Sequence, residues 1–80
     1  MHDWLIGARD RLAEATGEES AAYALSPADV EDLLELARIA AHESGERTNA
    51  PLVSYLVGLA RGRGGGDLSD LVDAVVGKRV

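Results

Sequence analysis

His42 and Glu43 come closest to a known metal-binding pattern. In zinc metalloproteases, two histidines four residues apart bind the ion from one helical face, and the glutamate after the first acts as general base. Glu46 stands where the second histidine is required, beyond Gly45, which we expect to end the helix. The pattern is incomplete. His42 is better interpreted as a residue of a last helical turn, where partial positive charge suits the helix dipole.

A group of acidic residues is the other candidate for chemistry: Asp29, Glu31, Asp32 and Glu35. Paired carboxylates can serve as general acid and base. This group, however, begins in the first turn of a predicted helix, where acids are electrostatically favoured, and continues around a face typical of solvent exposure. The chain has no cysteine, and no serine stands in a recognisable nucleophile elbow. The sequence therefore predicts no catalytic residue, no metal site and no cofactor, and hence no enzyme.

A glycine-rich segment over residues 61–66 carries two arginines and is similar in composition to phosphate-binding loops and RNA-binding segments. A P-loop needs lysine followed by serine or threonine after the glycines, whereas Asp67, the expected cap of the next helix, follows here. Two arginines are also few for non-specific RNA binding, so a flexible hinge is the favoured interpretation. Arg47, Arg61 and Arg63 still form a local basic exception in an acidic protein. They are candidates for contacting an anionic partner surface or a nucleotide.

The elements that must position these residues are helices, since no segment has the pattern of a strand. Apolar residues recur at helical spacing in four stretches, namely residues 4–15, 27–44, 49–61 and 68–76. Ser26, Pro27 and Asp29 predict the start of the second helix, and Gly45 predicts its end. Short connections favour antiparallel neighbours. The sequence therefore predicts an all-α fold, a compact four-helix bundle with mostly antiparallel neighbours, in a single domain over residues 1–80.

The stretch from residue 50 to residue 60 is apolar around more than half of its circumference. Such a helix belongs in the middle of a bundle or at an interface, so we expect it to be the hub around which three amphipathic neighbours assemble. Gly58 would then let a neighbouring helix approach closely. Leu56 would lie in the core, where an aspartate would unfold the domain. Trp4 allows two interpretations: it fills the core, or it belongs to an exposed patch that docks another protein.

The chain is acidic, with a formal net charge of −6 and an isoelectric point near 4.7. A negatively charged surface repels nucleic-acid phosphates and anionic lipids, so we expect neither nucleic acid nor a membrane as a partner. The longest nearly apolar stretch is too short to span a bilayer, and the first residues lack the pattern of a signal peptide. We therefore expect a cytoplasmic protein. Its small core favours additional stabilisation by a partner protein.

Three groups of residues carry a resemblance to a known family. They are Asp3-Trp4-Leu5, residues 33–38 leading to Ala41-His42, and Arg47 followed by Ala50-Pro51-Leu52 and residues 55–60. In this order they resemble a small bacterial domain of unknown function. That domain occurs as short proteins, or fused or adjacent to molybdenum cofactor guanylyltransferase, which attaches a nucleotide to molybdopterin. The likeness covers residues 4–76 and is sharpest over residues 42–58. It implies an accessory or interaction domain near pterin cofactor synthesis, and it assigns no catalytic residue.

The favoured hypothesis is a non-enzymatic accessory domain that binds a protein, which the resemblance suggests is the guanylyltransferase. The candidate contact residues are Trp4, His42, Arg47, Arg61 and Arg63. An acidic carrier protein would need a serine after an aspartate at the start of its second helix, whereas Asp67-Leu68-Ser69 has another order and starts the fourth. A helix-turn-helix module would need a basic recognition helix, which no segment provides. The sequence leaves homodimer formation open.

Overall fold

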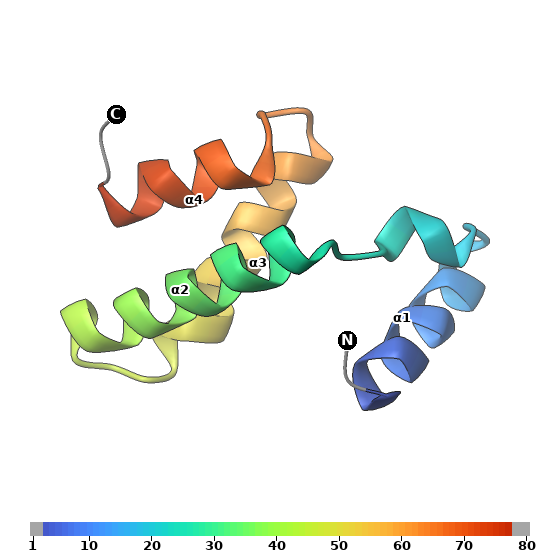
Figure 1. The fold of residues 1–80 in the computed structure, drawn as a ribbon, viewed down its shortest axis with the longest axis horizontal. Helices are drawn as coiled ribbons and strands as arrows, with labels where there is room; N and C mark the ends of the chain where they lie inside the picture. The colour runs from blue at the N-terminus through green and yellow to red at the C-terminus, as the bar shows by residue number, and fades with distance from the viewer. Residues whose placement is uncertain (1–2, 78–80) are drawn as a thin grey trace.

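The computed structural model describes residues 3–77 and contains helices only within that range (Figure 1). The elements, in chain order, are α1 (Asp3–Thr16), the short 3-10 helix η1 (Ser20–Tyr23), α2 (Pro27–Ser44), α3 (Asn49–Gly62) and α4 (Leu68–Val76). The predicted all-α class and its four α-helices are confirmed. The chain reverses direction between α2 and α3 and again between α3 and α4, as short connections require (Figure 1).

Local capping residues define the ends of α2. The Ser26 hydroxyl accepts a hydrogen bond from the Asp29 backbone N–H, and the Asp29 carboxylate accepts one from the Ser26 backbone N–H, both at 3.0 Å. Gly45 ends the helix in the left-handed conformation, with φ of 74°, which costs little without a Cβ. These predictions are confirmed. Asp67 precedes α4 as predicted, although its side chain makes no capping hydrogen bond.

The core lies where α2, α3 and α4 pack against one another. Leu36 of α2 is fully buried and forms one cluster with Val57 of α3 and with Leu68 and Val72 of α4. Partly buried aliphatic side chains surround this cluster, namely Leu33, Val53, Leu71 and Val76. The core is therefore aliphatic, and each of the three helices contributes to it.

The first helix is separate from this three-helix unit. Together, α1 and η1 form what we call the arm, residues 3–23, in which α1 packs against η1 and, among the described helices, against no other. Figure 1 shows the arm to one side of α2, α3 and α4, joined to them by a short connection over residues 24–26. The molecule has extents of 35 × 25 × 20 Å.

The expectation that residues 50–60 contact three neighbours is correct for α2 and α4 and wrong for α1. Val57 is buried, but Leu56 is 60% exposed, so its predicted place in the core is also wrong. A Cβ on Gly58 would meet no atom within 4 Å, and no neighbouring helix uses that position for a close approach. The reason is that α2 and α4 cover only one side of α3. The opposite side keeps its apolar residues in solvent: Leu52, Tyr55, Leu56 and Leu59.

Two leucines on α2 provide a matched test of the core. Leu36 is 0% exposed, whereas Leu34 is 66% exposed. We expect Leu36→Ala to lower the free energy of unfolding by about 2–5 kcal/mol, because it leaves a cavity among three helices. For a domain of this size the loss approaches the whole stability. Leu34→Ala should change it by less than about 0.5 kcal/mol. Urea unfolding followed by circular dichroism measures both, and equal effects would contradict the assignment of the core.

Two glycines give opposite predictions. Gly65 donates its backbone N–H to the Ala60 carbonyl oxygen at 2.8 Å, and a Cβ on Gly65 would lie 2.8 Å from that same oxygen. Gly65→Ala should therefore lower the melting temperature, because the turn after α3 has to open. Gly58→Ala should raise the free energy of unfolding by about 0.5–1 kcal/mol, because alanine favours the helix and meets no neighbour. A stabilising Gly65→Ala would show that this turn is not closed as described.

Candidate docking site

A cleft open to solvent separates the arm from α3. Leu12 and Tyr23 line it from the arm. On the other side it is lined by residues of α3 and the position that follows it: Ser54, Tyr55, Gly58, Leu59, Gly62 and Arg63. We call this the arm cleft. Its volume of about 650 Å³ lies within the range of small-molecule pockets.

The arm side of the cleft is held together by hydrogen bonds. Tyr23 donates its hydroxyl proton to Thr16 Oγ1 at 3.1 Å. The Thr16 hydroxyl in turn lies 3.1 Å from the Leu12 carbonyl oxygen and 3.2 Å from that of Ala13. Ala13 is buried where α1 meets η1. The Tyr23 ring is thus fixed to the end of α1 and presents one wall of the cleft.

The apolar surface continues from the cleft along α1. A second hollow of about 250 Å³ is lined by residues of α1, η1 and the connection: Leu5, Ala8, Arg9, Leu12, Tyr23 and Leu25. Leu12 and Tyr23 border both hollows. On the other wall, Tyr55 is 67% exposed, and Leu59 is also exposed. Apolar side chains from the arm and from α3 therefore face one open space, which is typical of a site that binds another molecule.

Positive charge lies at one end of the cleft. Arg61 and Arg63 are exposed there, and residues 49–63 contain no acidic residue. The glycines that follow form a hydrogen-bonded turn in which Gly64 donates to Arg61 and Gly65 to Ala60 through the backbone. This turn carries the chain away from α3 beyond Arg63. An acidic group of a bound molecule would be attracted to this end of the arm cleft.

The five sequence-predicted contact residues do not converge. Arg63 lines the arm cleft, and Arg61 lines a hollow that adjoins it beside Gly58 and Gly62. Trp4 is 69% exposed near the start of α1, so it does not fill the core. His42 lies in the last turn of α2 and Arg47 in the following connection, both exposed. That connection precedes α3, whereas Arg63 follows it, about 20 Å further along the helix axis.

Sequence reasoning missed the apolar residues of the cleft. Leu12, Tyr23, Tyr55 and Leu59 belong to three elements, and their proximity depends on the path of the connection between η1 and α2. The one available signal was the breadth of the apolar surface on residues 50–60, which exceeds what two neighbouring helices cover.

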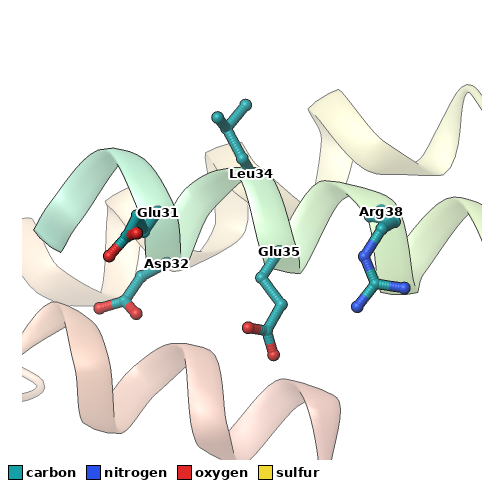
Figure 2. Close-up of a pocket in the computed structure, with 5 residues that line it drawn as sticks. All are labelled: Glu31, Asp32, Leu34, Glu35 and Arg38. Atoms are coloured by element: carbon teal, nitrogen blue, oxygen red, sulfur yellow. The ribbon is translucent and has the colours of Figure 1, made fainter. Parts of the chain in front are cut away.

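The acidic residues of α2 lie beside a different, shallow hollow (Figure 2). Glu31, Asp32, Glu35 and Arg38 line it together with Leu34, whose side chain points away from the carboxylates in Figure 2. All five residues come from one helix, and the Arg38 side chain lies at the end of the row beyond Glu35 (Figure 2). Within residues 3–77, no group of three histidine or acidic side chains is arranged to hold a metal ion. None of the helices in that range is long and apolar enough to cross a bilayer.

One ion pair on the arm lowers the pKa of a carboxyl group. Arg9 donates from Nε and Nη2 to Asp10 Oδ1 at 3.1 and 2.9 Å. The Arg9 guanidinium, and to a smaller extent a hydrogen bond from Ser20, lowers the pKa of Asp10 below its ordinary value. A lowered pKa in the folded protein stabilises the fold above the ordinary pKa of aspartate. This contribution is lost as the pH falls through the folded value.

We expect Arg9→Gln to raise the Asp10 pKa toward its ordinary value, because it removes the first and largest cause of the shift. Arg11→Gln serves as the matched control, since it removes the same charge nearby and leaves the hydrogen bonds from Arg9 to Asp10 in place. NMR titration of the Asp10 carboxyl carbon reports the pKa in each variant. An unchanged pKa in Arg9→Gln would contradict the ion pair.

Comparison with known proteins agrees with a small domain of unassigned activity. The family model described as "Domain of unknown function (DUF6457)" matches residues 1–79. Neither a curated protein nor a solved structure was found to match the chain. The family description names no activity and gives no link to a guanylyltransferase. Because the match covers nearly the whole sequence, the chain belongs to the DUF6457 family.

Proposed function

We propose that this chain is a non-enzymatic accessory domain that docks another protein in the arm cleft. The observation that carries the proposal is the exposure of Leu12, Tyr55 and Leu59 around one open space. Solvent-exposed apolar patches of this kind are uncommon on monomeric proteins unless they bind something. Tyrosine is also among the residues that contribute most to binding energy at protein interfaces.

The chemistry of the lining supports docking over catalysis. Leucine, tyrosine and glycine offer apolar contact area, and Arg63 adds a charge at the rim. A general acid and base acting together would need two titratable groups directed at one reacting atom. The carboxylates that come nearest to such a pair, those of α2, line a separate hollow outside the arm cleft (Figure 2).

We propose molybdenum cofactor guanylyltransferase as the partner, on the basis of the family resemblance drawn from the sequence. In this proposal an apolar segment of the enzyme enters the arm cleft. Arg61 and Arg63 face an acidic group next to that segment, because they lie at the one end of the cleft that carries positive charge. The domain then belongs to the same cofactor pathway without performing a step of it.

Isothermal titration calorimetry of this chain against the purified guanylyltransferase tests the proposal. We expect binding by the wild-type chain and at least about tenfold weaker binding by Tyr55→Ala, because truncating an aromatic anchor costs more than 1 kcal/mol at many interfaces. Leu34→Ala is the matched control, since Leu34 is equally exposed but lies on α2 outside the arm cleft. Its affinity should equal that of the wild type.

Two results would argue against this role. Absence of binding by the wild-type chain would reject the guanylyltransferase as partner. Equal affinities of the wild type and Tyr55→Ala would reject the arm cleft as the binding surface.

A further inference from the structure

Two apolar surfaces of the same chain are not covered by another described helix. One is the stripe on α1 that includes Leu5 and Leu12. The other, which we call the α3 outer face, consists of Leu52, Tyr55, Leu56 and Leu59. Among the described helices, α1 packs against none beyond η1, and α3 packs only against α2 and α4. Each of the two surfaces is therefore an apolar face that the other could cover.

The amount of exposed surface is larger than a monomer of this mass normally leaves. The accessible surface is 5972 Å², whereas the usual scaling with mass gives about 4,600 Å² for a globular monomer of 8.4 kDa. The excess, roughly 1,400 Å², exceeds the approximately 800 Å² that each partner buries in a standard interface. The chain thus has enough uncovered surface for a stable complex with one further molecule.

The charges of the two surfaces are opposite. The residues of α1, 3–16, contain three acidic residues and two arginines, a net charge of −1, and Glu18 and Glu19 follow the helix. Residues 49–63, which include α3, contain Arg61 and Arg63 and no acidic residue, a net charge of +2. Two molecules of this chain repel each other through their overall charge of −6. Contact between α1 of one molecule and α3 of the other places segments of opposite net charge together.

We infer that the occupant is a second copy of this chain, in a homodimer where α1 of each molecule packs on the α3 outer face of the other. When a twofold axis relates the two molecules, the contact forms twice and the assembly closes at two molecules. The inference rests on the docking role proposed above, because Tyr55 and Leu59 belong to both surfaces. The second copy and a foreign partner then compete for the same residues.

Sedimentation velocity of the full chain over about 1–200 µM tests the oligomeric state. We expect a reversible dimer with a dissociation constant on the order of micromolar, as for interfaces of modest size. Leu56→Asp should weaken the dimer at least tenfold, because it places a carboxylate on the α3 outer face. Leu34→Asp, an equally exposed leucine on α2, should leave it unchanged. Circular dichroism shows whether each variant keeps its helices.

Paramagnetic relaxation in mixed dimers tests the pairing of surfaces and needs no variant of the α3 outer face. A nitroxide is attached at Glu14→Cys in an unlabelled chain, which otherwise has no cysteine, and this chain is mixed with ¹⁵N-labelled wild-type chain. We expect broadened amide signals in residues 52–59 of the labelled chain. Broadening confined to α1 or α4 would overturn the pairing.

The two proposals fail separately. A chain that is monomeric at all concentrations overturns the homodimer, even if it binds the guanylyltransferase through Tyr55. A dimer with broadening over residues 52–59 supports the inference, even if no guanylyltransferase binds.

Discussion

The buried cluster of Leu36, Val57, Leu68 and Val72 is the interaction on which the rest of the structure depends. It joins α2, α3 and α4 through a single layer of aliphatic side chains, and no aromatic residue takes part in it. Because this cluster lies on one side of α3, the position of the core fixes which side of that helix is left to solvent. The exposed apolar face of α3 is thus a direct result of where the core formed.

A core of this size has a second consequence for the arm. Packing α1 against the three-helix unit would require another layer of buried side chains between them, and the structure shows only Ala13 buried on α1. The arm is instead stabilised by local contacts, among them the hydrogen bond from Tyr23 to Thr16 and the ion pair of Arg9 with Asp10. The cleft exists because these local contacts hold Tyr23 beside α3 without closing the space between them.

The features that the sequence predicted well are those set by neighbouring residues. Ser26, Asp29 and Gly45 mark the ends of α2 because capping depends on a few adjacent backbone groups. The four helices follow from apolar periodicity for the same reason. Periodicity also shows that α3 is apolar on nearly every side, but it carries no information on how many neighbours are present to cover those sides. Leu56 was therefore expected in the core, and the structure places it in solvent.

The candidate site was predictable only in its charged part. Arg61 and Arg63 stand out in an acidic sequence, and Arg63 does line the cleft. The apolar wall depends instead on the direction in which residues 24–26 leave η1, and no composition or spacing encodes that direction. Tyr23 in particular lies in a short 3-10 helix that has no periodic pattern. Its role as the side chain that borders three neighbouring hollows is visible only in three dimensions.

The short connection over residues 24–26 also separates the arm from the rest of the chain energetically. With no helix of the three-helix unit packed against α1, local opening of the arm exposes no part of the Leu36 cluster. Amide hydrogens of α1 would then exchange with solvent through fluctuations of the arm alone, while those around Leu36 require global unfolding. Substitutions on the surface of α1 therefore act on the arm alone and leave the packing of α2, α3 and α4 unchanged.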